Sequence, residues 1–242
     1  MSGPRRTYPA AITEDGATAP EQSQEQALRW VVEKHQEHGG RILLLVPNKA
    51  SFASTNSLLS DFGKLSDVTV DTLRGGLAWS GGVVLAAWPT REALAAIADD
   101  DRVRALCVIP WGDEDSRSWE IAYAPERLGD TAQPTAAPLD PVVVVALTQL
   151  TGMVNHANNL AGALDHRDAV AVLRLLHKGK YALPHEAVYE WALANGWPAR
   201  GAERLRAMAE KIDAGRTVQM KGTSPLTSDT LARWKAAASA KG

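Results

Sequence analysis

The chain has 242 residues, of which 45% are apolar and 22% are charged, as in ordinary soluble globular proteins. No stretch approaches the roughly 18 consecutive apolar residues of a membrane-spanning helix. The N-terminal residues also lack the apolar segment of a secretory signal peptide. We therefore expect a cytoplasmic protein with no membrane partner. The one cysteine, Cys107, lies in an apolar run and predicts a core residue rather than a disulfide.

Charge is distributed unevenly between the two halves of the sequence. Residues 1–140 contain 13 Lys and Arg against 20 Asp and Glu, whereas residues 141–242 contain 13 against 8. This asymmetry suggests two modules with different partners, or two halves that attract each other.

The first half alternates short apolar runs with helical patterns. Residues 1–20 lack periodicity and predict a disordered tail. Strands buried on both faces are predicted for the apolar runs 41–46, 83–88 and 103–109, and a strand nearer an edge for residues 68–73. Helices are predicted over 22–38, 51–62 and 91–98. The fold class is therefore α/β, with a small parallel sheet of about four strands in a domain over residues 21–130.

The second half follows a linker, residues 131–140, that is rich in Ala, Pro and Thr. Residues 141–242 predict a mostly α domain. Its expected helices cover 141–160, a segment opened by Asp165 and Asp168 and ended by Gly179, then 184–194, 199–214 and 227–238. Residues 216–220 could form a short strand. The order of the two helices around Asn195-Gly-Trp-Pro198 and this strand resembles a winged helix-turn-helix.

Basic residues mark one face of the helix over 199–214. The apolar residues Ala202, Leu205, Met208, Ala209 and Ile212 share one side of this helix. Another side carries Arg200, Arg204 and Lys211, and Lys178, Lys180 and Arg216 lie nearby in sequence. Because phosphate charge drives nucleic-acid affinity, these six residues are the predicted nucleic-acid-binding set. Glu203 and Glu210, which flank the stripe, and the role of Trp191 and Trp197 as core residues weigh against this interpretation.

A second candidate site lies where the predicted parallel strands end. Ligands in such sheets bind beyond the carboxyl ends of the strands. Three strands here end in proline, and the possible ligand edge comprises Asn48, Lys49, Ser51, Trp88, Thr90, Arg91 and Trp111. The acidic run Asp113-Glu114-Asp115 follows the third strand and is either part of this edge or a solvated loop. The polar run Asn155-His-Ala-Asn-Asn159 is expected to be either a pocket wall or, more often for such a run, a frayed last turn of its helix.

The order of these elements resembles a RecA-like domain of the superfamily-two helicases over about residues 22–115. Arg41-Ile-Leu-Leu-Leu-Val-Pro-Asn-Lys-Ala50 looks like the first backbone-contacting strand and turn of that family. Val83-Val-Leu-Ala-Ala-Trp88 with Thr90-Arg-Glu-Ala-Leu94 looks like a later one, and Asp113-Glu114-Asp115 sits where the family keeps its metal-binding acidic motif. The sequence departs from the family in two ways. It has no Gly-x-x-x-x-Gly-Lys-Ser/Thr, and Pro110-Trp111-Gly112 displaces the acidic run. The resemblance therefore implies a degenerate, binding-only module without NTP hydrolysis.

Other enzyme classes lack the required side chains. Residues 39–155 contain no histidine, which leaves a hydrolytic triad without its base, and six scattered histidines with one cysteine offer no zinc site. We expect no catalytic residue, no metal and no cofactor. Three functions remain open: a nucleic-acid-binding or helicase-accessory protein, a protein–protein adaptor that docks through the acidic half, and a small-molecule binder or enzyme at the strand ends.

Overall fold

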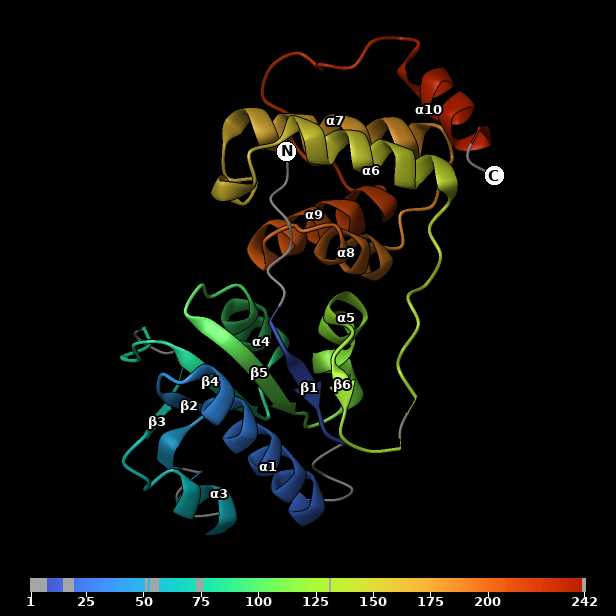
Figure 1. Ribbon diagram of the computed structural model, residues 1–242. Helices are drawn as coiled ribbons and strands as arrows, with labels where there is room; N and C mark the ends of the chain where they lie inside the picture. Colours follow the sequence, from blue (N-terminus) through green and yellow to red (C-terminus); the bar gives the residue numbers. More distant parts are fainter. Residues whose placement is uncertain are drawn as a thin grey trace. The chain divides into compact units, whose positions relative to one another are not determined.

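The computed structural model describes residues 8–14, 20–50, 52, 57–72, 76–130 and 132–240 (Figure 1). Contacts divide the chain into two compact units that meet in sequence at Pro134 and Thr135, a division that falls within residues 131–140. We refer to residues 6–134 as the α/β unit and to residues 135–242 as the helical unit, and describe each by itself. An α/β part followed by a mostly helical part is the predicted fold class, which is confirmed.

In the described residues of the α/β unit, six strands form one sheet in the order β3-β2-β4-β5-β1-β6, and all paired neighbours are parallel. The strands are β1 (Ala10–Ile12), β2 (Ile42–Leu45), β3 (Val68–Asp71), β4 (Gly82–Ala87), β5 (Val103–Ile109) and β6 (Glu126–Arg127). The helices are α1 (Pro20–His38), α3 (Ser57–Phe62), α4 (Arg91–Ala98) and α5 (Asp113–Tyr123). The predicted buried strands correspond to β2, β4 and β5, and β3 lies at the sheet edge as predicted. Part of the predicted helix over 51–62 lies outside the described residues.

Strand β1 corrects the prediction of a disordered tail over residues 1–20 for the part that the structure describes, residues 8–14; residues 1–7 and 15–19 lie outside the described residues. Ala11 and Ile12 are fully or almost fully buried, and β1 lies inside the sheet between β5 and β6. The backbone N–H of Leu106 donates to Pro9 and that of Leu128 donates to Ile12. Together with β6, which was also missed, this strand raises the predicted four strands to six. With three and two residues, both strands are too short to show a periodic pattern. The strands β5 and β1 that pair with them lie far away in sequence, so local sequence does not reveal them either.

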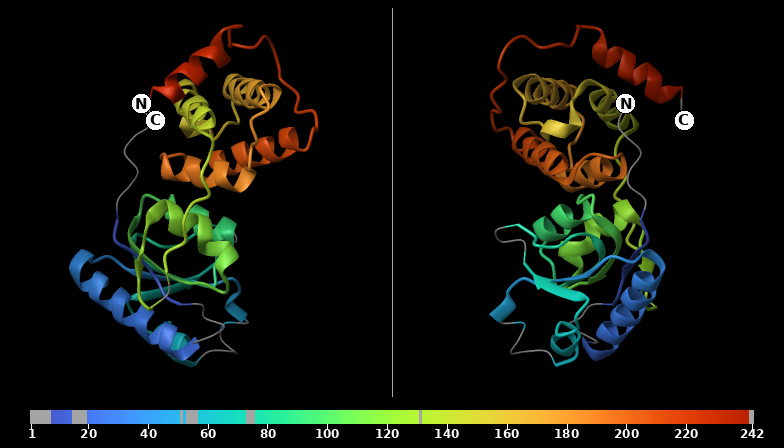
Figure 2. Two further views of the ribbon diagram at one scale, coloured as in Figure 1. Left: turned by 90° about the vertical axis from the view of Figure 1, so that its right-hand side faces the viewer. Right: turned by 60° about the vertical axis from the view of Figure 1, so that its left-hand side comes forward.

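Helices cover both faces of the sheet (Figures 1 and 2). One apolar cluster joins the strands to α1 and α3 through Trp30, Val31, Leu59 and Phe62, and the other joins them to α4 and α5 through Leu94, Ile97 and Trp119. Alternate residues of β4 and β5 face the two clusters, which explains why both strands are apolar apart from Arg104 near the start of β5. Cys107 is fully buried, as predicted, and burial raises the pKa of its thiol.

Strand β4 begins against the backbone at the start of β2. Gly82 has a φ of 141°, and the ladder between β4 and β5 shifts register between Gly82 and Val83. A Cβ atom built at Gly82 would lie 2.4 Å from the carbonyl oxygen of Arg41 and 2.8 Å from its nitrogen. No side chain fits at this position without a backbone shift.

Helix α5, which the sequence left unassigned, ends at a non-glycine residue in the left-handed region. Ala124 has a φ of 45° and a ψ of 54°, and its N–H donates to the carbonyl of Glu120. Within the helix, Glu120 is buried and accepts hydrogen bonds from Ser116 and from Arg127 of β6. This pairing places a carboxylate in the interior, which a pattern of apolar residues does not reveal.

Ala124→Gly is expected to stabilise the α/β unit by about 1 kcal/mol, because a left-handed residue with a Cβ is strained by about that amount. The matched control is Ala122→Gly, which places glycine inside the same helix and is expected to cost about 1 kcal/mol. Urea unfolding followed by circular dichroism measures both changes. Destabilisation by both variants to the same extent would contradict the assigned backbone conformation of Ala124.

The helical unit contains α6 (Pro141–Met153), a 3-10 helix η1 (His156–Asn158), α7 (Ala163–Lys178), α8 (His185–Ala194), α9 (Ala199–Asp213) and α10 (Thr230–Ser239). Asp140 caps α6 by accepting from the N–H of Val142 at 2.7 Å, with Pro141 at the first helical position as predicted. Two predictions are wrong. Helix α6 ends at Met153 rather than near residue 160, and the proposed wing strand over 216–220 is absent, because these described residues form neither helix nor strand.

Helices α6, α7, α8 and α9 build the core of the helical unit, and α10 packs against α6. Trp234 of α10 is 2% exposed and its indole N–H donates to the side-chain oxygen of Gln149 in α6 at 2.7 Å. Leu147, Leu173 and Leu205 are completely buried on α6, α7 and α9. Within the described ranges, no helix combines the length and apolarity needed to cross a membrane.

Candidate functional sites

Helices α8 and α9 are joined by the tight turn predicted from Asn195 to Pro198. The N–H groups of Asn195 and Trp197 donate to carbonyls of α8, and Gly196 takes a φ of 80°. Trp197 is 3% exposed and donates through its indole N–H to the hydroxyl of Thr151, so it is a core residue rather than a base-stacking one. The two helices and the short turn have the order of a helix-turn-helix, without the wing.

Helix α9 has a buried side and a basic exposed side. The predicted apolar set is entirely buried: Ala202, Leu205, Met208, Ala209 and Ile212. Arg200, Arg204 and Lys211 are exposed and fall within one narrow arc of the helix at about 100° per residue. We call these three residues the basic stripe. The structure therefore brings together half of the six residues predicted from the sequence.

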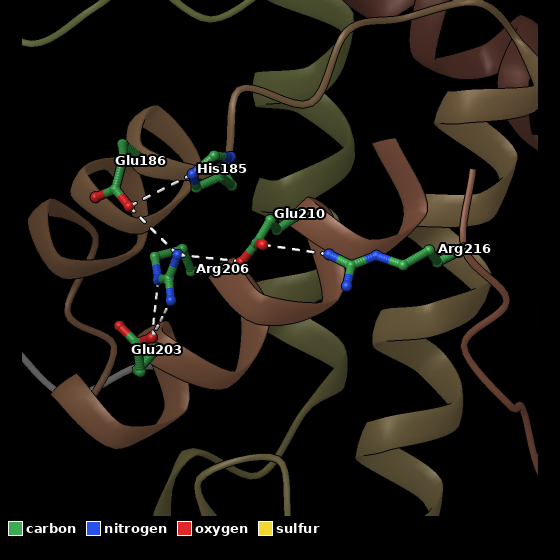
Figure 3. A network of polar contacts seen from close by, with 6 residues as sticks. All are labelled: His185, Glu186, Glu203, Arg206, Glu210 and Arg216. Carbon is green, nitrogen blue, oxygen red and sulfur yellow. Dashed lines mark hydrogen bonds and ion pairs between the residues drawn. The ribbon is translucent and has the colours of Figure 1, made fainter. Parts of the chain in front are cut away.

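The acidic residues beside the basic stripe are compensated by a network centred on Arg206 (Figure 3). The guanidinium of Arg206 pairs with Glu203 at 2.6 Å, Glu186 of α8 at 3.3 Å and Glu210 at 3.5 Å. Arg216 pairs with Glu210 at 3.2 Å, and the imidazole of His185 lies 3.7 Å from Glu186. The hydrogen bond from Arg206 to Glu203 raises the pKa of Arg206 above its ordinary value, and the negative charges of Glu186 and Glu210 add to this effect. The sequence did not indicate this network, because its members come from two helices and the following loop.

The other predicted basic residues have different roles. Arg216 belongs to the network around Arg206, so its positive charge is partly offset by its ion pair with Glu210. Arg204 donates to the backbone carbonyl of Asn159 at 2.7 Å while staying exposed. Lys178 and Lys180 are exposed at the end of α7, and Lys180 has a φ of 67°. In the part of the chain that the structure describes, neither Arg200 nor Lys211 forms an ion pair.

The polar run 155–159 is not the frayed end of a helix but a defined turn. Asn155 caps η1, and the N–H of Asn155 itself donates to the buried carboxylate of Asp165 at 3.1 Å. His156 contacts the carbonyl of Thr151 through Nε2 and lies edge-on to the ring of Trp197 at 4.9 Å. The turn packs against the start of α9, where Gly201 faces Asn159. The turn thereby positions the backbone carbonyl of Asn159, which accepts a hydrogen bond from Arg204.

At the carboxyl ends of β2 and β3, some side chains of the predicted ligand edge already form contacts within the chain. Lys49 forms an ion pair with Asp71 at 2.9 Å, and Asn48 accepts from the N–H of Ala50 at 2.8 Å. Asp71 also accepts from the N–H groups of Thr72 and Ala78. Ser51 lies outside the described residues.

Asp71 is a site residue that sequence reasoning missed, although its place at the end of a predicted strand offered a signal. Burial raises the pKa of its carboxyl, but the hydrogen bond from Lys49 and those from the backbone outweigh burial and leave the pKa below its usual value. A lowered carboxyl pKa means that this pairing stabilises the fold above the ordinary carboxyl range. The contribution is lost as the pH falls through the lowered pKa.

At the ends of β4 and β5, two tryptophans meet. The rings of Trp88 and Trp111 are edge-to-face with centroids 6.3 Å apart. Thr90 caps α4 as predicted, accepting from the N–H of Ala93 at 3.2 Å. The N–H of Arg91 donates to Asp115 at the start of α5, so the two helix starts are tied together. Asp115 thus belongs to a defined contact, while the side chain of Asp113 lies outside the description.

No group of three or more His, Cys, Asp or Glu side chains in the described residues could hold a metal ion. The finding includes Glu114 and Asp115 of the acidic run after β5, whereas the side chain of Asp113 is not described.

Comparisons with known proteins give one family model that is similar to part of the chain. Residues 139–235 match the model of DUF1889, a domain of unknown function. A solved crystal structure from Salmonella typhimurium is similar, with 21% sequence identity over 40% of this chain and 95% of that chain, at a TM-score of 0.36. A search of curated proteins gives no match. None of these similarities indicates an activity.

Proposed function

We propose that this protein is a non-catalytic nucleic-acid-binding or helicase-accessory protein that contacts the phosphate backbone through the basic stripe of α9. The observation that carries this proposal is the combination of an exposed row of Arg200, Arg204 and Lys211 with a neighbouring acidic row whose charge is largely neutralised by Arg206 and Arg216. Without that neutralisation, Glu203 and Glu210 would repel a polyanion. With it, the stripe is the dominant local charge on this side of the helix.

The geometry of the stripe suits an extended polyanion. Arg200 and Lys211 are three helical turns apart, about 16 Å along the axis at 1.5 Å per residue. Duplex DNA carries one negative charge per about 1.7 Å of axis, so a helix lying along it faces several phosphates. The hydrogen bond from Arg204 to Asn159 fixes one guanidinium in the row, which lowers the entropy that binding must remove.

The proposal assigns no NTP hydrolysis to the α/β unit. The sequence has no Gly-x-x-x-x-Gly-Lys-Ser/Thr, so the backbone cradle and lysine that hold the phosphates of a nucleotide are missing. A helicase-accessory role would then consist of nucleic-acid binding alone.

The double change Arg200→Ala and Lys211→Ala is expected to weaken binding to duplex DNA about equally for all sequences. The slope of log affinity against log salt should fall by roughly 2, since each phosphate contact contributes about 1. Arg204 is kept because it also braces the turn at Asn159. Fluorescence anisotropy with a labelled duplex at two salt concentrations measures both quantities.

The matched control is Arg174→Ala with Lys221→Ala, which removes one exposed arginine and one exposed lysine from elsewhere in the helical unit. This control should leave the salt slope within experimental error. Equal losses in both double variants would mean that net charge rather than the stripe attracts DNA. Absence of binding by the unaltered chain at low salt would reject the proposal and favour a protein partner.

A further inference from the structure

Trp111 is an exposed aromatic side chain at the carboxyl edge of the sheet in the α/β unit. It follows the inner strand β5 directly after Pro110, and 64% of its surface is exposed. Single exposed apolar residues are common, but an exposed indole is a large and rigid surface. Its neighbour Trp88 follows the adjacent strand β4, so the two rings stand side by side where parallel sheets bind their ligands.

The backbone of Trp88 is strained. Its φ is 53°, in the region that residues with a Cβ rarely adopt, although its N–H still donates to the carbonyl of Ile109 at 2.8 Å. Pro89 follows, and a residue before proline is normally extended with a φ near −120°. Such strain persists only where the surrounding structure enforces it, and it gathers at binding sites.

The indole N–H of Trp88 is a donor without an acceptor. Its Nε1 atom is shielded from solvent and has no hydrogen-bond partner in the described part of the chain. Buried donors are nearly always paired, because an unpaired one loses its hydrogen bonds to water without replacement. Backbone strain, a donor without a partner among the described residues and an exposed aromatic face therefore coincide at the ends of β4 and β5.

We propose that the pair Trp88–Trp111 binds an uncharged planar heteroaromatic ring, which stacks on Trp111 and offers a ring nitrogen or carbonyl to the N–H of Trp88. The pair is edge-to-face, so one face of Trp111 remains available for stacking. Binding would supply the missing acceptor after a small rotation of the indoles. This site is independent of the basic stripe, and its ligand class follows from ring stacking rather than from phosphate.

The charges around the pair are of both signs, with Arg91 at the start of α4 after Trp88 and acidic residues after Trp111, so they do not single out a phosphate. The exposed acidic residues Glu114 and Asp115 stand in the first turn of α5, directly after Trp111 and Gly112. Lys49, at the end of β2, is already paired with Asp71. The N–H of Arg91 donates to Asp115 and so ties together the two helix starts that follow Trp88 and Trp111.

The test uses adenosine and guanosine as probes and ribose as the control, since ribose carries the sugar without the ring. The full chain, labelled with ¹⁵N, shows one indole N–H signal for each of its eight tryptophans. Either nucleoside is expected to shift the signals of Trp88 and Trp111, with ribose leaving them unchanged. A dissociation constant of about 1 mM is sufficient for detection. The signal of Trp119 should stay in place, because this residue also has a shielded, unpartnered Nε1 but lies in the core.

Two variants separate stacking from hydrogen bonding. Trp111→Ala should weaken binding about tenfold or more, as expected for loss of a ring that stacks on a base. Trp88→Phe keeps a ring and removes the donor, and should weaken binding severalfold. Thermal unfolding of each variant checks that the fold is kept. Absence of any shift with both nucleosides, equal shifts with ribose, or unchanged affinity in folded Trp111→Ala would each overturn the proposal.

Discussion

Replacing Gly82 with alanine is expected to destabilise the α/β unit by about 3 kcal/mol or more, a large part of the 5–15 kcal/mol of a typical domain. The added Cβ would lie 2.4 Å from the carbonyl oxygen of Arg41. Backbone strain at a φ of 141° costs roughly 1–3 kcal/mol, and forcing the β2 and β4 backbones apart costs a similar amount. Thermal and urea unfolding, followed by the near-ultraviolet signal of the tryptophans, measure the loss.

The control for this change is Gly112→Ala. Gly112 has an extended φ of −178°, and a Cβ built there meets no atom within 4 Å. Its replacement should change stability by only about 0.5 kcal/mol. If the two alanine variants were equally stable, the close approach of Gly82 to Arg41 would be wrong.

Leu205→Asp is expected to unfold the helical unit. Leu205 is completely buried in α9, and a carboxylate placed there would have to remain charged without a partner or take up a proton, at a cost of several kcal/mol. The control is Arg200→Asp, which puts the same side chain on the exposed face of the same helix. Near the helix start a carboxylate is even mildly favourable.

The indole N–H signals report on each unit separately. In Leu205→Asp, the signals of the helical unit should collapse to the positions of an unfolded chain; they belong to Trp191, Trp197 and Trp234. In Arg200→Asp they should keep their native dispersion. Native signals from all three residues in Leu205→Asp would show that α9 does not carry the core of this unit.

The sequence predicts most of this fold because its central strands are short, strongly apolar runs between turn residues. Ile42–Leu45 is apolar throughout, and Val103–Ile109 is apolar except for Arg104, as expected for strands covered on both faces. Strand β1 has three residues and β6 has two, so neither can show a period. The sequence does not predict the end of α6, because the helix is ended by an extended backbone at Val154. The next residue, Asn155, starts a turn that a hydrogen bond from its N–H to Asp165 stabilises, and this contact lies ten residues away.

The candidate sites were predictable to the extent that they follow helical spacing. The basic stripe of α9 follows from a periodicity of 3.6 residues, but the network of Arg206 depends on Glu186 from another helix and Arg216 from a loop. At the sheet edge, the proline after each strand indicated where the side chains would gather. The left-handed conformation of Trp88 could not be foreseen, because tryptophan before proline normally favours extended backbone.

The position of β1 has a consequence for how the chain is made. Ala10 pairs with Leu106 and Ala11 with Glu126, so β1 is synthesised well before either of the strands that flank it. Contacts that span such a distance in sequence form late, since the loop between them must first be closed. Until then, β5 has an open edge that can pair with other chains. A shortened gene that begins at Pro20 would leave that edge open permanently.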